Sequence, residues 1–146
     1  MTLLRMDNVS INVDDLRGAI AFFTELGMEL EGSEMAIEGP WVDRIIALED
    51  VRTDIAMMRT PDGHNRLELT KFHQPATVGA SAGEPANTHG IRRIMFAVDD
   101  LDDTLERLRP HGAELVGEVV RFEDAYKLCY LRGPEGVVIA LAEPLS

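Results

Sequence analysis

The sequence predicts an α+β protein built from two tandem βαβββ modules. One observation is an internal repeat: Met6–Val13, followed by Asp-Asp-Leu, returns as Ile91–Val98, again followed by Asp-Asp-Leu. Gly27 and Gly112 are separated by the same 85 positions as these two segments. A second observation is that the spacing of apolar residues changes from two to three or four and back within each copy. The chain is therefore predicted to contain one strand–helix–strand unit twice.

The first module is predicted to begin with a strand, a helix and a second strand. Met6–Val13 alternates polar and apolar residues, which predicts a strand with one face packed against a helix. Asp14 or Asp15 then caps a helix, which ends at Gly27. A short strand is expected around Glu29–Gly32. The apolar stripe of the helix consists of Leu16, Ile20, Phe23 and Leu26.

The rest of the first module is predicted to hold a less regular segment and two strands. The segment Glu34–Val51 has no clear period, and Pro40 opens a turn or short helix within it. The two strands are Thr53–Thr60 and Arg66–Phe72, joined by the Pro-Asp-Gly turn at Pro61–Gly63.

The second module repeats the plan. Ile91–Val98 is the strand, and Asp99 or Asp100 caps a helix that ends at Gly112. The turn Pro-Glu-Gly at Pro134–Gly136 matches the Pro-Asp-Gly turn of the first copy. Three further strands are expected, at Glu114–Phe122, Tyr126–Leu131 and Val137–Ala142.

We interpret residues 1–146 as one domain with two modules, residues 1–73 and 91–146. Residues 74–90 are rich in Ala, Gly, Pro and Ser without periodicity, which is typical of a linker. A chain of 146 residues is long enough for a sizeable core.

Composition and charge narrow the classes of function. The net charge of −12 disfavours binding to nucleic acid and to anionic membranes. No apolar run approaches the roughly 20 residues that span a bilayer, and the first residues do not resemble a signal peptide. The single cysteine, Cys129, suits a reducing cytoplasm and is expected to be a small buried apolar residue.

The duplicated pattern resembles the vicinal oxygen chelate superfamily, which includes glyoxalase I, methylmalonyl-CoA epimerase, extradiol dioxygenases and bleomycin-resistance proteins. The resemblance rests on MDNVSINVDDLRGAIAFF, PDGHNRLELTKF, GIRRIMFAVDDLD and RGPEGVVIALAE, and it spans almost the whole chain. It implies curled mixed sheets that form a cup with the site on the inner wall. It also implies a homodimer that binds a small molecule.

Enzymes of this superfamily bind a divalent metal through four cup-facing positions. The resemblance places these positions at Asn8, Glu68, Arg93 and Ala140. Only Glu68 is a good ligand, and Arg93 would put a fixed positive charge where the cation should lie. We therefore expect no metal or other cofactor. This disfavours the metal-dependent chemistry of glyoxalase I and, more strongly, that of the extradiol dioxygenases.

Glu68 and Arg93 are the candidate catalytic residues. They could form a structural ion pair, or Arg93 could anchor an anionic oxygen while Glu68 accepts a proton. Strand alternation adds further residues to the predicted cup, namely Asn8, Ser10, Asn12, Thr70 and Met95.

Three aromatic residues are further candidates for substrate binding. Trp41 could form an aromatic wall over the mouth of the cup or pack into the core beside Ile45 and Ile46. Tyr126 and Tyr130 lie on the same face of their strand, and the sequence leaves open whether that face is the inner one.

Three functions follow as hypotheses. The leading one is metal-independent lyase or isomerase chemistry on a small organic anion, with Glu68 as the base and Arg93 as the oxyanion anchor. The second is binding without turnover, as in a resistance protein that sequesters an antibiotic or metabolite. The third is a metal-dependent lactoylglutathione lyase or epimerase with an atypical ligand set of Glu68 and His89.

Overall fold

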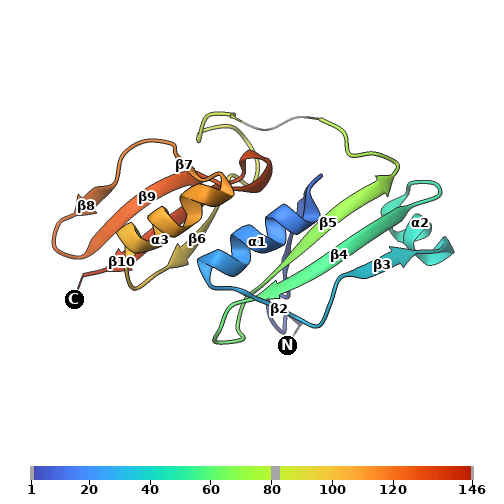
Figure 1. The fold of residues 1–146 in the computed structure, drawn as a ribbon. Coiled ribbons are helices and arrows are strands. Elements are labelled where there is room, and N and C mark those ends of the chain that lie inside the picture. The colour runs from blue at the N-terminus through green and yellow to red at the C-terminus, as the bar shows by residue number, and fades with distance from the viewer. Residues whose placement is uncertain (1, 80–82, 146) are drawn as a thin grey trace. The chain divides into compact units, whose positions relative to one another are not determined.

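The computed structural model describes residues 2–79 and 83–145. The chain divides into two compact units, residues 1–79 (module 1) and 80–146 (module 2). The division falls inside the segment predicted to be a linker, of which residues 80–82 lie outside the described residues. Figure 1 shows the elements of both modules.

Module 1 contains a five-stranded mixed sheet in the order β1-β5-β4-β2, with β3 also paired to β4. Strand β1 runs parallel to β5, and the other pairs are antiparallel. The elements are β1 (Val9–Asn12), α1 (Leu16–Leu26), β2 (Glu29–Leu30), β3 (Met35–Glu38), α2 (Pro40–Ile46), β4 (Arg52–Arg59) and β5 (Arg66–Gln74).

Module 2 has the same plan, with a five-stranded mixed sheet in the order β6-β10-β9-β7 and β8 paired to β9. Strand β6 runs parallel to β10. The elements are β6 (Arg93–Ala97), α3 (Leu101–Leu108), β7 (Glu114–Leu115), β8 (Val120–Phe122), β9 (Tyr126–Arg132) and β10 (Val138–Pro144), with short 3-10 helices at Arg109–His111 and Pro134–Gly136. The predicted fold class, two tandem modules with mixed sheets, is confirmed.

The second strand of each module is interrupted, which the sequence did not predict. Strands β2 and β3 pair with successive parts of β4, and β7 and β8 pair with successive parts of β9. The prediction of an irregular segment from Glu34 was therefore wrong for Met35–Glu38, although the helix opened by Pro40 is confirmed. The continuous strand predicted over Glu114–Phe122 was also wrong. Pieces of two to four residues are too short to show a clear period of two.

The end of the predicted linker is attached to module 2. The Arg92 guanidinium donates to Glu84 Oε2 at 2.7 Å, and Arg132 Nη2 donates to the Glu84 carbonyl oxygen at 2.6 Å. Strand β5 takes up the other end as far as Gln74. Among the described residues no helix or strand lies between Gln74 and Arg93, so regular structure resumes at Arg93 and not at Ile91 as predicted.

Each main helix begins at the second aspartate of its Asp-Asp pair. Asp15 accepts a hydrogen bond from the Gly18 amide at 2.9 Å, and Asp100 accepts one from the Asp103 amide at 3.0 Å. Both satisfy an amide that the first turn of a helix leaves without an internal partner. The sequence had left Asp99 and Asp100 as alternatives, and the structure selects Asp100.

Replacing Asp100 with alanine is expected to lower the free energy of unfolding by about 1 kcal/mol, because the amide of Asp103 loses its partner. Asp99→Ala removes the same charge without removing the cap, so it should change the free energy by less than about 0.5 kcal/mol. Urea unfolding of both variants measures the difference. Equal losses would show that charge, and not the cap, is responsible.

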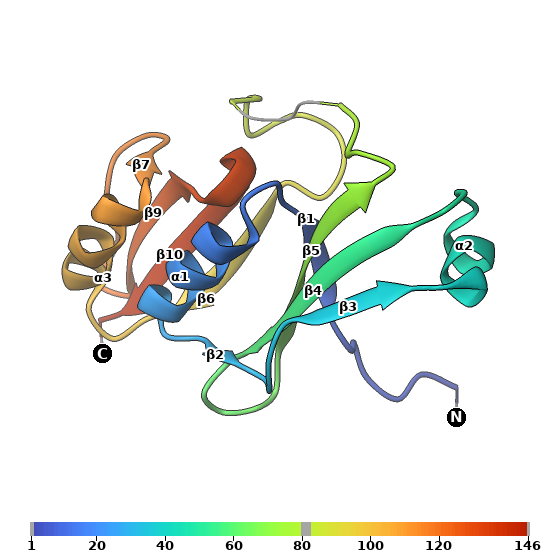
Figure 2. The ribbon, with the colours of Figure 1, turned by 45° about the vertical axis from the view of Figure 1, so that its right-hand side comes forward.

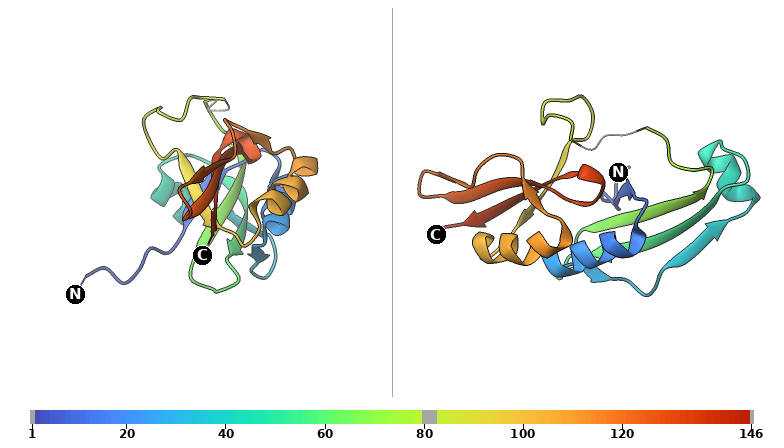
Figure 3. Two further views of the ribbon diagram at one scale, coloured as in Figure 1. Left: turned by 90° about the vertical axis from the view of Figure 1, so that its left-hand side faces the viewer. Right: turned by 45° about the horizontal axis from the view of Figure 1, so that its top comes forward.

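The main helix of each module covers one face of its sheet, as the views in Figures 2 and 3 show. Lys71 Nζ of β5 donates to the Asp14 carbonyl oxygen just before α1, and Lys127 of β9 pairs with Asp102 of α3. Since strand side chains alternate, residues of the same parity as Lys71 and Lys127 face the helices. We call the opposite side the helix-free face of each sheet.

The core of each module lies between its helix and its sheet. Phe22 and Phe23 of α1 are buried and meet edge to face, with ring centroids 5.2 Å apart. In module 2, Leu131 and Leu141 are fully buried beneath α3, and Cys129 is buried beside them, as predicted. Burial raises the pKa of the Cys129 thiol. Among the described residues, no helix is both long and apolar enough to cross a membrane.

Candidate functional site

The helix-free face of module 1 carries a polar cluster at its centre. Glu68 of β5 accepts hydrogen bonds at Oε2 from Ser10 Oγ and from Thr70 Oγ1, both at 3.2 Å. The two hydroxyl oxygens are also within 3.3 Å of each other. These three predicted site residues are thus brought together because β1 and β5 pair in parallel, with Ser10 opposite Glu68. Asn12 lies two residues further along β1 on the same face, opposite Thr70, and is exposed.

Apolar side chains flank this cluster on the neighbouring strand β4. Met57 lies opposite Glu68, and Ile55 lies opposite Thr70. Both are half-buried. The carboxylate of Glu68 is therefore fixed by two hydroxyls at one oxygen and lies in a row with apolar neighbours.

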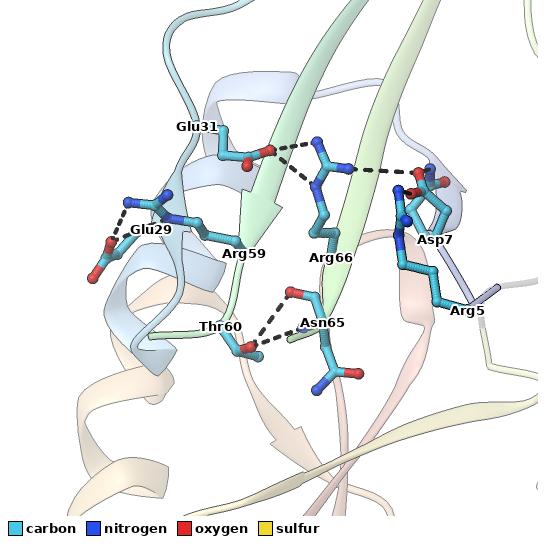
Figure 4. A network of polar contacts seen from close by, with 9 residues as sticks. Arg5, Asp7, Glu29, Glu31, Arg59, Thr60, Asn65 and Arg66 are labelled. Atoms are coloured by element: carbon cyan, nitrogen blue, oxygen red, sulfur yellow. Dashed lines mark hydrogen bonds and ion pairs between the residues drawn. The ribbon is translucent and has the colours of Figure 1, made fainter. Parts of the chain in front are cut away.

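A network of ion pairs holds the residues before β1 against the sheet, as Figure 4 shows. Arg66 donates to Glu31 Oε2 through Nε at 3.0 Å and Nη2 at 2.6 Å, and its Nη1 lies 3.5 Å from Asp7 Oδ2. Asp7 also accepts hydrogen bonds from Asn8 Nδ2 at 3.0 Å and Arg5 Nη2 at 3.1 Å. The hydrogen bonds from Asn8 and Arg5 lower the pKa of Asp7.

This network accounts for Asn8, which the sequence predicted on the first strand. Strand β1 begins only at Val9, so Asn8 precedes it and is exposed. Its amide contacts Asp7 in the described structure. The strand predicted from Met6 is shorter because residues 2–7 find no sheet partner among the described residues.

The helix-free face of module 2 carries Arg93 stacked on Tyr130. The Arg93 guanidinium carbon lies 5.3 Å from the centre of the Tyr130 ring. Arg93 is the first residue of β6, and its paired neighbour on β10 is Val138. The guanidinium therefore extends diagonally over β10 to reach β9, and cation–π attraction holds it there.

The strand pairing settles which way the two tyrosines point. Tyr130 pairs with Ala140, which pairs with Met95, and Tyr126 pairs with Pro144. Tyr126 and Tyr130 alternate with Lys127 on β9 and so lie on the helix-free face. Met95 is in register with Tyr130, and Arg93 has the same parity as Met95 on β6, so both lie on that face too. Sequence alone could not give this result, because it depends on the register of three strands.

The same face has an unusual balance of charge for so acidic a chain. Its central strands β6, β10 and β9 place two arginines on it, Arg93 and Arg132, and no Asp or Glu. Arg132 is occupied by the carbonyl oxygens of Gly136 and Glu84. Arg93 makes no ion pair with any described residue, so its charge is available to a ligand.

The residues at the four positions that the resemblance marks as metal-binding do not suit a metal ion. Ala140 offers a methyl group and is completely buried, and Arg93 is a cation stacked on Tyr130. Asn8 and Glu68 already have hydrogen-bonding partners in their own module. No three His, Cys, Asp or Glu side chains gather as a possible metal site within residues 2–79 and 83–145.

The histidines do not supply a metal site either. His89, the possible second ligand beside Glu68, is exposed and precedes the start of β6 at Arg93. His73 Nε2 lies 2.8 Å from Asp54 Oδ2 of β4, so this ring already has a partner within module 1. His64 and His111 are exposed.

Trp41 lies on α2 and is 55% exposed. Ile45 and Ile46 beside it are 76% and 40% exposed, so the predicted packing into a core was wrong. The helix buries Val42 instead. No described contact tests whether Trp41 binds a ligand, and this role stays a prediction.

Sequence reasoning missed two features. One is the ion pair of Arg66 with Glu31 in module 1, and the other is the apolar pair of Leu128 and Val120 on the helix-free face of module 2. Alternation along β9 places Leu128 with the two tyrosines and could have revealed the apolar pair. The sequence carries no signal for the pairing of Arg66 with Glu31, which are 35 positions apart.

Comparison with known proteins agrees with this architecture. The family model described as Glyoxalase/Bleomycin resistance protein/Dioxygenase superfamily matches residues 5–141. The crystal structure of a glyoxalase family protein from Bacillus cereus is 51% identical, covers 100% of this chain and 97% of its own, and has a TM-score of 0.95. A search of the curated proteins gave no match.

Two more distant structures share the fold. One is TnmS3, an antibiotic binding protein from Streptomyces sp. CB03234, with 18% identity, coverage of 99% and 98%, and a TM-score of 0.61. The other is the fosfomycin resistance protein FosX from Listeria monocytogenes in complex with Mn(II), with 15% identity, coverage of 96% and 90%, and a TM-score of 0.62. The tandem fold and the match over nearly the whole sequence show that this chain belongs to the glyoxalase/bleomycin resistance protein/dioxygenase superfamily.

Proposed function

We propose that the chain binds a small organic anion without a metal, and that Arg93 is its anchor. The observation that carries this proposal is the Arg93 guanidinium, whose carbon lies 5.3 Å from the centre of the Tyr130 ring on a face where the central strands present no Asp or Glu. The cation–π contact holds the guanidinium beside Tyr130 without using its N–H groups in an ion pair, so two of them can donate parallel hydrogen bonds to a carboxylate or phosphonate.

Calorimetric titration with 2-naphthoate and with the uncharged 2-naphthamide tests this function. The two probes share one ring system and differ in charge. We expect the anion to bind at least about tenfold more tightly, since hydrogen bonds to a charged group contribute about 1.5–3 kcal/mol. Equal affinities would contradict an anion site.

Metal independence is a separate expectation. Protein purified without chelator should contain well under one equivalent of Zn, Mn, Fe, Co or Ni by elemental analysis, because the four family positions offer one carboxylate among an amide, a methyl and a guanidinium. Treatment with EDTA should leave the affinity for 2-naphthoate unchanged. A stoichiometric metal whose removal abolishes binding would overturn this expectation.

A second candidate function, proton transfer, is favoured by the geometry of Glu68. Both of its hydroxyl donors reach Oε2, so Oε1 has no described partner and can accept a proton from a carbon next to a carbonyl group. The C–H bonding electrons would pass to the carbonyl oxygen as an enolate, and return of a proton to the same carbon from the opposite face would complete an epimerisation. The joint action of Glu68 and Arg93 on one substrate stays a prediction, and a double-mutant cycle measures it.

Exchange of substrate protons with deuterated water tests this candidate. A panel of 2-oxo acids should exchange their C3 protons faster with the protein than without it. Glu68→Gln should remove at least about 99% of that acceleration, within the 10²–10⁴-fold that general bases contribute. Glu31→Gln, which changes a carboxylate held by Arg66, should leave the rate unchanged. Binding without exchange would support sequestration alone.

A further inference from the structure

Beside the Arg93–Tyr130 pair, the helix-free face of module 2 leaves several large apolar side chains exposed. Val120 and Phe122 of the edge strand β8 are 51% and 57% exposed, and Tyr126 of β9 is 44% exposed. Val120 pairs with Leu128, and Phe122 pairs with Tyr126, so these side chains are neighbours on one face. Exposed apolar groups that gather in this way mark a surface that binds something.

These side chains form a strip that leads away from the anion anchor. Tyr130, Leu128 and Tyr126 alternate along β9, and a strand rises about 3.3 Å per residue, so the two tyrosines are roughly 13 Å apart along it. We define the aromatic strip as Val120, Phe122, Tyr126 and Leu128. An anion held at Arg93 would have this strip beside it.

Charge gives the strip a direction. The turn that joins β8 to β9 carries Glu123 and Asp124, at the end of the strip remote from Arg93. Arg121 and Lys127 lie between strip residues in sequence but point to the other face, where Lys127 pairs with Asp102. A ligand along the strip therefore has a cation at one end and acidic residues near the other, which favours one anionic group at the Arg93 end and disfavours a second one at the far end.

We infer that the ligand is a flat aromatic monoanion, whose rings lie along the aromatic strip and whose anionic group binds Arg93. Flat rings stack on Phe122 and Tyr126 in offset or edge-to-face geometry, which saturated rings cannot do. The inference rests on the proposed anion-binding function and adds the chemical class of the rest of the ligand.

The test compares 2-naphthoate with decahydro-2-naphthoate, which has the same carbon skeleton and charge but is not flat. We expect the aromatic anion to bind about tenfold more tightly, because aromatic pairs contribute about 0.5–1.5 kcal/mol beyond buried area. Adding a third ring, in anthracene-2-carboxylate, should raise the affinity about tenfold again. Phe122→Leu and Tyr126→Leu, which keep the strip apolar, should each remove most of the preference for the aromatic anion.

The outcomes separate this inference from the proposed function. If 2-naphthoate and decahydro-2-naphthoate bind equally and both depend on Arg93, the aromatic class is wrong and anion binding stands. If 2-naphthoate is preferred over its saturated counterpart but 2-naphthamide binds as well and Arg93→Met has no effect, the aromatic class stands and anion binding fails. If none of the probes binds, the inference is overturned.

A second copy of the chain could cover the strip instead. Sedimentation of the wild type and of Phe122→Leu and Tyr126→Leu decides this point. A dimer that becomes a monomer in these variants, while the affinity for 2-naphthoate is unchanged, would overturn the inference. An unchanged oligomeric state together with weaker binding of 2-naphthoate supports it.

Discussion

Replacing Arg93 with methionine is expected to weaken binding of 2-naphthoate by about 100-fold. The variant keeps an apolar side chain of similar length over Tyr130 but removes the donors that hold the anionic group. Loss of charge-assisted hydrogen bonds worth about 2.7 kcal/mol corresponds to this factor. Calorimetric titration measures it directly.

Two control variants make the result specific to Arg93. Arg93→Lys keeps the charge but loses the planar fork, so it should weaken binding by about five- to tenfold. Arg121→Met removes an equal charge from the opposite face of β8, and should change the affinity by less than about twofold. Similar losses in Arg93→Met and Arg121→Met would show that overall charge, and not an anchor, governs affinity.

Replacing Phe23 with alanine is expected to lower the free energy of unfolding by about 3–5 kcal/mol. Phe23 is completely buried between α1 and its sheet and meets Phe22 edge to face, so the substitution removes buried apolar surface and leaves a cavity. The loss is a large fraction of the 5–15 kcal/mol typical of a whole domain. Urea unfolding monitored by circular dichroism measures it.

Phe122→Ala provides the matched control, since Phe122 is 57% exposed on the edge strand β8. This substitution should lower the free energy of unfolding by less than about 1 kcal/mol, although it should weaken binding of 2-naphthoate. The two phenylalanines thus separate packing from ligand contact. A loss of stability as large as that of Phe23→Ala would show that Phe122 belongs to a core.

The fold was predictable because its signals are local and occur twice. Alternation on either side of Asp15 and Asp100, and the matched turns at Pro61–Gly63 and Pro134–Gly136, define the same strand–helix–strand order in both copies. The interruptions between β2 and β3 and between β7 and β8 were not predictable, because strands of a few residues have no measurable period.

The site was predictable only in part. The polar alternation of Ser10, Glu68 and Thr70 indicated one face, and the parallel pairing of β1 with β5 brings those residues together. The stacking of Arg93 on Tyr130 depends on the register of β6, β10 and β9, which no local pattern specifies. The contacts of Asn8 depend on where β1 begins, and helix and strand ends are the least certain part of any such prediction.

The most direct test of the central claim, that an aromatic anion binds without metal on the helix-free face of module 2, is the NMR spectrum of EDTA-treated protein labelled in its methionine methyl groups. Met95 is 55% exposed on that face, and Met35 is 53% exposed on module 1. Ring currents should shift the Met95 resonance in a saturable way as 2-naphthoate is added, and leave Met35 unchanged. An unshifted Met95, a shift of both residues alike, or a shift that needs added divalent metal would contradict the claim.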